Sequence, residues 1–147
     1  MIYIEAPNNY EGNERSLFLA GGITECPDWQ SELVEILKNE NITLLNPRRR
    51  NFPNTPDASE KQIIWEHEHL RKATAISFWF PKETLCPITL YELGTWSMTD
   101  KPLFIGVNPD YQRRRDVEIQ TKLARPEIKI VYYLEKLASQ IKNWTKL

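Results

Sequence analysis

One carboxylate in this sequence stands in an unusual place. Residues 78–94 read FWFPKETLCPITLYELG, and Glu92 is flanked there by apolar residues, shortly after a strongly apolar segment. Pro87 suits the first turn of a helix, so Glu92 is expected near a helix N-terminus. In that position the helix dipole and free N–H groups favour the ionised form of a carboxylate. We therefore expect Glu92 to act on a bound ligand; a partly buried acid paired with a distant arginine is the structural alternative.

Other residues able to touch a ligand follow the remaining apolar segments. They are two glycines, two amides, a cation, a carboxylate and a phenol: Gly21, Gly22, Asn46, Asn108, Arg48, Asp110 and Tyr111. Open parallel sheets bind ligands in the crevice beyond the carboxyl ends of their strands, which makes these residues candidate contacts. The structural alternatives are a tight turn for the glycines and a solvated loop for Arg48 to Arg50.

Short apolar runs alternate with helical patterns along the whole chain. Strands are predicted at 16–20, 42–45, 75–80, 103–107 and 128–131, and residues 1–5 can add an edge strand. Helices are predicted at about 27–39, 57–73, 87–98, 112–124 and 134–145. Because parallel strands need crossover connections, this alternation predicts a parallel sheet with helices on both faces. The expected fold class is α/β, a flavodoxin-like or Rossmann-like three-layer sandwich with a five-stranded, mainly parallel sheet.

The second predicted helix has a recognisable start and a buried face. Asp57, with Glu60 three residues later, predicts a capping box. The buried face is predicted to carry four residues at core spacing: Ile63, His67, Leu70 and Ala73. Residues 6–15 are predicted to form a surface loop.

Length, charge and cysteine usage exclude several classes of protein. The 147 residues suit one domain, 1–147, and a net charge of −1 gives no overall attraction to nucleic acid or anionic membranes. No apolar run approaches the ~20 residues of a membrane span, and residues 1–15 are too polar for a signal peptide. Cys26 and Cys86 lack metal-type spacing and are expected as reduced thiols of a cytoplasmic protein. His67 and His69 point to different sides of a helix, so no metal site is expected.

Several segments, taken together and in order, resemble one enzyme family. They are FLAGGI (18–23), DWQ (28–30), LLNPRR (44–49), WEHEHLRKATAISFWFP (65–81) and PITLYELG (87–94). Over about residues 16–112 the chain resembles the nucleoside 2-deoxyribosyltransferase superfamily, closest to its short bacterial and phage branch. The resemblance implies that Glu92 is a nucleophile that attacks the anomeric carbon of 2-deoxyribose and forms a covalent glycosyl-enzyme. A second base, or water, then attacks this intermediate, with overall retention of configuration.

The resemblance also implies roles for other residues. A carboxylate on the helix before the third predicted strand would assist the leaving base; Glu66 is preferred over Glu68, and surface ion pairs are their structural alternative. Asp28 and Gln30 are implied contacts to sugar hydroxyls or to the base edge, and Arg48 to a ligand oxygen or a 5′-phosphate. The remaining implied substrate contacts are Gly21, Gly22, Asn46, Phe18, Trp79, Asn108, Asp110 and Tyr111. For Trp79 a core or subunit-contact position is favoured over base stacking.

Two positions depart from the family pattern. Phe18 stands where better-known members carry a tyrosine, and Cys86 where they carry an aspartate; Tyr91, Tyr111 or Asp110 can substitute. These departures leave cleavage of the glycosidic bond more firmly implied than transfer to a second base.

The resemblance implies small-molecule partners and self-association. The partners are nucleosides and free nucleobases, with no nucleic acid, no membrane, no metal and no cofactor. A homo-oligomer with shared active sites is expected, with Trp96, Trp144 and Tyr111 as interface candidates.

Four functions remain open from the sequence. The leading one is exchange of purine or pyrimidine bases on 2-deoxyribose. The second is hydrolysis of a 2-deoxynucleoside, or of its 5′-monophosphate, by the same glutamate. Cleavage of the nicotinamide–ribose bond of NAD is the third, and a nucleotide-binding module without catalysis, favoured by the two departures, is the fourth.

Overall fold

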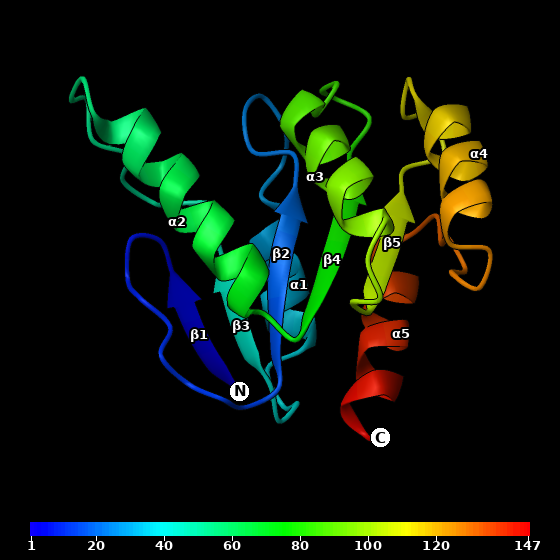
Figure 1. Ribbon diagram of the computed structural model, residues 1–147, viewed down its shortest axis with the longest axis horizontal. Helices are drawn as coiled ribbons and strands as arrows, with labels where there is room; N and C mark the ends of the chain where they lie inside the picture. Colours follow the sequence, from blue (N-terminus) through cyan, green and yellow to red (C-terminus); the bar gives the residue numbers. More distant parts are fainter.

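A five-stranded parallel sheet forms the centre of the molecule (Figure 1). The structure is a computed structural model that describes all 147 residues. The strands are β1 (Ile2–Glu5), β2 (Ser16–Gly21), β3 (Thr43–Asn46), β4 (Ala75–Phe80) and β5 (Leu103–Val107), in the order β1-β3-β2-β4-β5. Every neighbouring pair is parallel, so the predicted fold class is confirmed. Both chain termini lie at the end of the sheet opposite the tips of the strand arrows (Figure 1).

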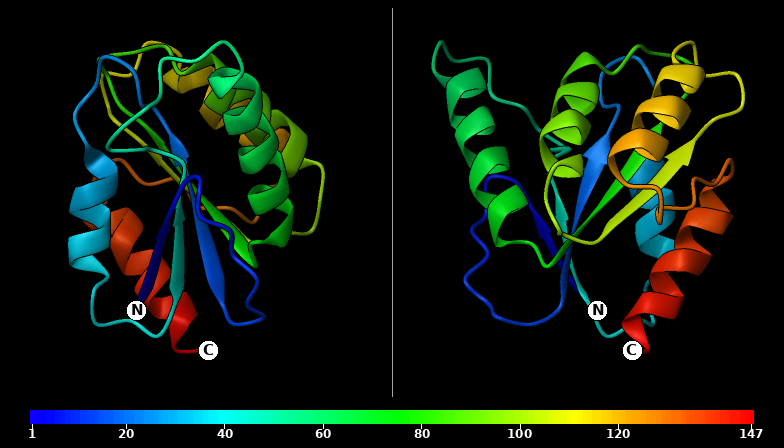
Figure 2. Two further views of the ribbon diagram at one scale, coloured as in Figure 1. Left: turned by 90° about the vertical axis from the view of Figure 1, so that its left-hand side faces the viewer. Right: turned by 45° about the vertical axis from the view of Figure 1, so that its right-hand side comes forward.

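Helices cover both faces of this sheet (Figure 2). One face carries α1 (Trp29–Ile36) and α5 (Leu134–Thr145), and the other carries α2 (Ala58–Lys72), α3 (Pro87–Ser97) and α4 (Arg114–Ala124). None of the five helices combines the length and apolarity needed to cross a membrane. The result is a three-layer sandwich, as the alternation of patterns predicts.

The strands separate two hydrophobic layers because successive side chains on a strand point to opposite faces. In β2, Phe18 and Ala20 belong to the layer shared with α2, α3 and α4. Leu17 and Leu19 belong to the layer shared with α1 and α5. Burial on both faces explains why the strands are continuous apolar runs in the sequence.

The fifth strand is not where the sequence predicts it. Residues 1–5 supply the edge strand β1, whereas the strand predicted at 128–131 is wrong. Only Val131 makes a bridge, to Gly106 of β5. The segment leads from α4 on one face to α5 on the other, so it crosses the edge of the sheet instead of running along it. Its side chains divide accordingly, with Ile128 packing in one hydrophobic layer and Val131 in the other.

The buried face of α2 also differs from the prediction. Ile63 is 61% exposed and His67 is exposed, so their predicted core positions are wrong. The predicted core positions of Leu70 and Ala73 are confirmed, and Trp65 and His69 join them at the inner face. Polar residues such as His69 occupy inward positions of α2. The hydrophobic pattern alone therefore assigns the wrong side of this helix to the core.

His69 is inward because it holds the loop of residues 6–15 against α2. Its Nε2 accepts a hydrogen bond from the backbone N–H of Tyr10 (3.1 Å), and its Nδ1 lies 2.7 Å from the carbonyl of Trp65 and donates to it. The Trp65 indole donates to the carbonyl of Asn8. The loop therefore runs over the surface, as predicted, but is pinned at buried points.

Asp57 precedes α2 without capping it. Its side chain makes no capping hydrogen bond and instead pairs with Lys61 at 2.7 Å, so the predicted capping box is wrong. At the start of α1, by contrast, Asp28 accepts a hydrogen bond from the N–H of Ser31, which fixes the first turn of that helix.

Candidate functional site

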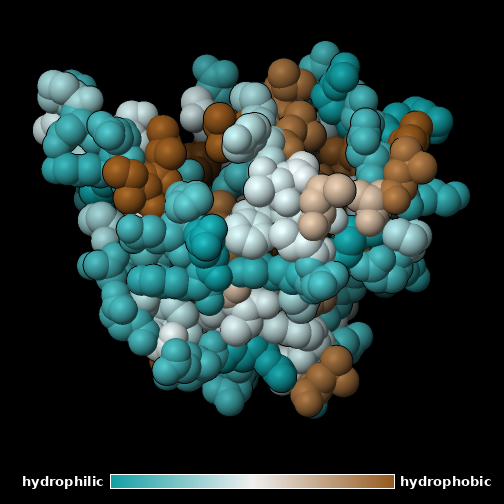
Figure 3. Space-filling view, viewed as in Figure 1, coloured by the Kyte–Doolittle hydropathy of each residue, from teal (hydrophilic) through white to brown (hydrophobic).

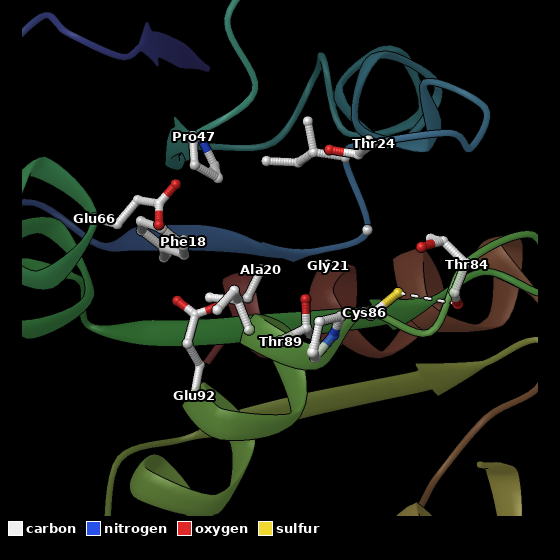
Figure 4. Close-up of a pocket in the computed structure, with 14 residues that line it drawn as sticks. Phe18, Ala20, Gly21, Thr24, Pro47, Glu66, Thr84, Cys86, Thr89 and Glu92 are labelled. Atoms are coloured by element: carbon white, nitrogen blue, oxygen red, sulfur yellow. Dashed lines mark hydrogen bonds between the residues drawn. The ribbon is translucent and has the colours of Figure 1, made fainter. Parts of the chain in front are cut away.

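A cavity opens at the carboxyl ends of β2 and β4. From β2 the chain passes to β3 on one side, and from β3 it crosses β2 to reach β4 on the other side. Such a change of direction is where open α/β sheets bind ligands. The cavity measures about 330 Å³, which lies within the range of small-molecule sites. Its walls come from β2, α2, α3 and the segments that follow β2, β3 and β4 (Figure 4).

Gly21 and Gly22 line this cavity and let the end of β2 pack closely against its neighbours. A Cβ on Gly21 would lie 2.4 Å from the Trp29 ring, and a Cβ on Gly22 would lie 2.8 Å from Pro81. Neither glycine has a positive φ angle, so close approach is what excludes a side chain here. Both sulfurs, of Cys26 and Cys86, also lie about 3 Å from that same point on Gly22.

Two carboxyl groups enter the cavity from different helices. Glu92 lies on the second turn of α3, which begins with Pro87 after Cys86, a residue in the left-handed region at φ 53°. Glu66 comes from α2. In Figure 4 both carboxyl groups point into the space beside Phe18 and Ala20. The sequence places these acids on different predicted helices, and the fold brings them to one cavity.

Burial changes the ionisation of both acids. It raises the pKa of Glu92 to about 8, with the negative charge of Glu66 as the second cause. Burial also raises the pKa of Glu66, while a hydrogen bond from Gln62 acts in the opposite direction. The expectation that the helix N-terminus keeps Glu92 ionised is therefore wrong. Two nearby buried carboxyl groups do not both ionise readily, so the pair retains a proton more readily than an exposed carboxyl group does.

Arg48 lies outside the cavity wall and is committed to protein carbonyls. Its guanidinium donates to the carbonyls of Pro27 (2.9 Å) and Cys26 (3.1 Å) and to the side-chain oxygen of Gln30 (3.0 Å). These bonds clamp the segment between β2 and α1. No lysine, arginine or histidine is among the residues that line the cavity.

Gln30 and Asn46 support this clamp from buried positions. Gln30 also donates to the carbonyl of Gly22 (3.1 Å), and Asn46 accepts from the backbone N–H of Arg48 (2.9 Å). Neither lines the cavity, and Asp28 is half-exposed at the start of α1. The three residues shape the loop beside the site.

The remaining predicted contacts lie elsewhere. Trp79 and Asn108 line a separate depression on the α1 and α5 side of the sheet. Tyr111 is buried against Phe80 and donates to the carbonyl of Leu85 at 2.6 Å. The two residues that are exposed away from the cavity are Asp110 and Glu68.

Some lining residues are missing from the sequence-based set. Thr89 is 3% exposed and its side chain points into the cavity in Figure 4. It precedes Glu92 by three residues, so the helical repeat alone could have placed it on the same face. Pro47 and Thr24 also line the cavity, but they lie on irregular segments whose course no local pattern predicts. Phe18 and Cys86, the two departures from the family pattern, both lie in the wall.

Comparison with known protein families gives one match. A family model described as "Nucleoside 2-deoxyribosyltransferase like" matches residues 14–111, about two-thirds of the chain. The matched range includes both acids and the other lining residues of the cavity. A search of curated proteins finds no match.

Proposed function

The chain belongs to the nucleoside 2-deoxyribosyltransferase-like family, and from this premise we propose that it exchanges nucleobases on 2-deoxyribose. The observation that carries the proposal is the pair of carboxyl groups, Glu92 and Glu66, in one cavity at the strand ends. One carboxylate can attack the sugar while the other carboxyl group serves the leaving base, and both roles need a site shielded from water.

The reaction we propose has two displacements. The carboxylate of Glu92 attacks C1′ as the bond to the base breaks, through a transition state that resembles an oxocarbenium ion. The departing ring nitrogen takes a proton from Glu66. A second base then attacks C1′ of the glycosyl-enzyme from the face that the first base left, so the configuration is retained overall. Because a 2-deoxy sugar lacks an electron-withdrawing 2′-hydroxyl, its developing cation is destabilised less.

The charge of the cavity favours a neutral nucleoside over a nucleotide. A 5′-phosphate would need cationic partners, and the lining offers none. Arg48, the sequence-based candidate for that role, already donates to Pro27, Cys26 and Gln30. Buried hydroxyl groups such as that of Thr89 are suited to hydrogen-bond a sugar hydroxyl.

The direct test is base exchange. Protein mixed with a deoxynucleoside and a different free base should yield a new deoxynucleoside, measured by liquid chromatography. Glu92→Gln should lower the rate by at least about a thousandfold, because the nucleophile is lost. Glu60→Gln, which changes an exposed glutamate on α2, is the matched control and should keep full activity.

The same incubation separates transferase from hydrolase. Base released equally fast without an acceptor would assign hydrolysis, and faster release from the 5′-monophosphate would contradict the preference for a neutral substrate. Intact-mass spectrometry should show a deoxyribosyl adduct on Glu92 in the transferase. A melting temperature raised by deoxynucleosides without any turnover would instead indicate a binding module.

A further inference from the structure

Gln62 lies one helical turn before Glu66 on α2 and joins two walls of the cavity. Its Nε2 donates to the carbonyl oxygen of Pro47 (2.8 Å) and to Oε1 of Glu66 (3.0 Å). Pro47 and Glu66 both line the cavity. One amide group therefore ties the segment after β3 to the carboxyl group on α2.

The partners of Gln62 fix the direction of its amide. A carbonyl oxygen only accepts hydrogen bonds, so the NH₂ group must face Pro47, and its second hydrogen is left for Glu66. In this orientation Oε1 of Gln62 is buried without a hydrogen-bond partner, which opposes folding. The reversed amide would instead place Oε1 against the carbonyl of Pro47. The orientation that the fold retains directs a donor at Glu66.

A donor stabilises a carboxylate more than a neutral carboxylic acid, because a hydrogen bond to an ionised acceptor is the stronger one. Glu66 has such a partner in Gln62. For Glu92 the influences are burial and the charge of Glu66, with no hydrogen bond among them. For Glu66 they are burial and the Gln62 amide. The Gln62 amide is thus a donor that Glu66 has and Glu92 lacks.

We propose, building on the proposed function, that Gln62 is a positioning residue: before substrate binds, it keeps Glu66 as the carboxylate of the pair and leaves the proton of the pair on Glu92. When a deoxynucleoside binds, the proton passes from Glu92 to Glu66 and then to the departing ring nitrogen. The Glu92 Oε–C1′ bond forms, the C1′–N bond breaks, and the electron pair of the broken bond takes the proton. Because Gln62 stabilises ionised Glu66, it also makes protonated Glu66 a stronger acid toward the base.

Replacing Gln62 by methionine removes the donor at similar volume. The acidic limb of the pH profile of kcat/KM should move up by about one pH unit, since a hydrogen bond to a charged group is worth about that shift. The alkaline limb, set by Glu92, should stay in place. A purely structural role for Gln62 would lower activity and melting temperature without moving the acidic limb, and that result would overturn the proposal.

Two further variants sharpen this test. In a Glu66→Gln background, Gln62→Met should cause no additional loss of kcat/KM, because its effect acts through Glu66; losses that multiply would overturn the proposal. Gln140→Met is the matched control. Gln140, on α5, also donates to a backbone carbonyl, that of Lys129 (2.9 Å). Its pH profile should equal that of the wild type.

The two carboxyl groups can also be titrated without substrate, by carbon-13 NMR of labelled glutamate. Glu66 should ionise before Glu92, and Gln62→Met should raise the midpoint of Glu66. Ionisation of Glu92 first, or an unmoved Glu66 midpoint, would overturn the Gln62 proposal even if the wild type exchanges bases. The protein could instead show the expected order of titration and yet catalyse neither base exchange nor hydrolysis. That result would refute the proposed function and leave the Gln62 assignment in place.

Discussion

At the scale of single residues, Glu92 is both a candidate nucleophile and a buried acid that resists ionisation. Its surroundings raise its pKa from 4.5 to about 8. The folded chain is therefore less stable with Glu92 ionised than with Glu92 protonated. This contribution to stability is fully present below pH 4.5 and is lost as the pH rises through about 8.

We predict that Glu92→Gln stabilises the folded protein in a pH-dependent way. Glutamine keeps the shape of the side chain but never ionises, so the variant avoids the cost of a buried charge. Its melting temperature should equal that of the wild type near pH 4 and exceed it by a few degrees at pH 8. Differential scanning calorimetry from pH 4 to 9 measures this, with Glu60→Gln as control. A wild type as stable as the variant at pH 8 would contradict the burial of a charged Glu92.

The sequence identifies some site residues and misses others for physical reasons. Glu92 is found because a carboxylate among apolar residues after a strand is locally unusual. The raised pKa of Glu92 cannot be predicted from the sequence. Its causes, burial and the charge of Glu66, depend on how α3 packs and on a residue of a different helix. Arg48 shows the same limit, because the carbonyls that occupy it belong to another loop.

At the scale of elements, α3 carries glycine where the structure leaves room for a side chain. A Cβ on Gly94 would meet no atom within 4 Å, whereas a Cβ on Gly22 would lie 2.8 Å from Pro81 and 3.0 Å from the sulfur of Cys86. The two glycines therefore have opposite structural roles.

We predict that Gly94→Ala raises stability and Gly22→Ala lowers it. Alanine in a helix interior is favoured over glycine by about 0.5–1 kcal/mol, so Gly94→Ala should raise the melting temperature by roughly 1–4 °C. Gly22→Ala forces atoms apart in a packed region and should cost about 1–3 kcal/mol. Thermal melts of both variants measure this. A Gly94→Ala variant that melts below the wild type would contradict this reading of the open space around Gly94.

Two elements show where periodicity fails as a predictor. The inward positions of α2 include His69, which holds Tyr10, and a face chosen by hydrophobicity therefore takes Ile63 instead. Residues 128–131 have strand-like composition, yet the chain there must cross from one face of the sheet to the other. In both cases a tertiary demand overrides a local preference.

At the scale of the whole molecule, the alternation of apolar runs and helical patterns predicts the layered architecture. Strand order does not follow from that alternation, because β1 joins the edge through β3, far along the chain. The residues expected at a subunit interface, Trp96, Trp144 and Tyr111, are buried or half-buried within the single chain. Several exposed apolar residues instead lie on α2, α3 and α4, on the face shown in Figure 3.

We predict that the protein is a homo-oligomer held through the face formed by α3 and α4. Met98, just after α3, and Leu123 on α4 are 80% and 77% exposed, and burying their apolar surface against a second copy would be favourable. Light scattering coupled to gel filtration should show an oligomer. Met98→Lys combined with Leu123→Lys should shift it toward monomer, and Ser139→Lys on α5 should not. A monomeric wild type at high concentration would contradict this.

The location of the two chain termini has a practical consequence. The cavity opens at the strand tips, and both termini lie at the opposite end of the sheet (Figure 1). A peptide linker fused to either terminus would leave the molecule on the far side from the cavity mouth. Protein tethered to beads by either end should therefore keep its entrance open to solutes.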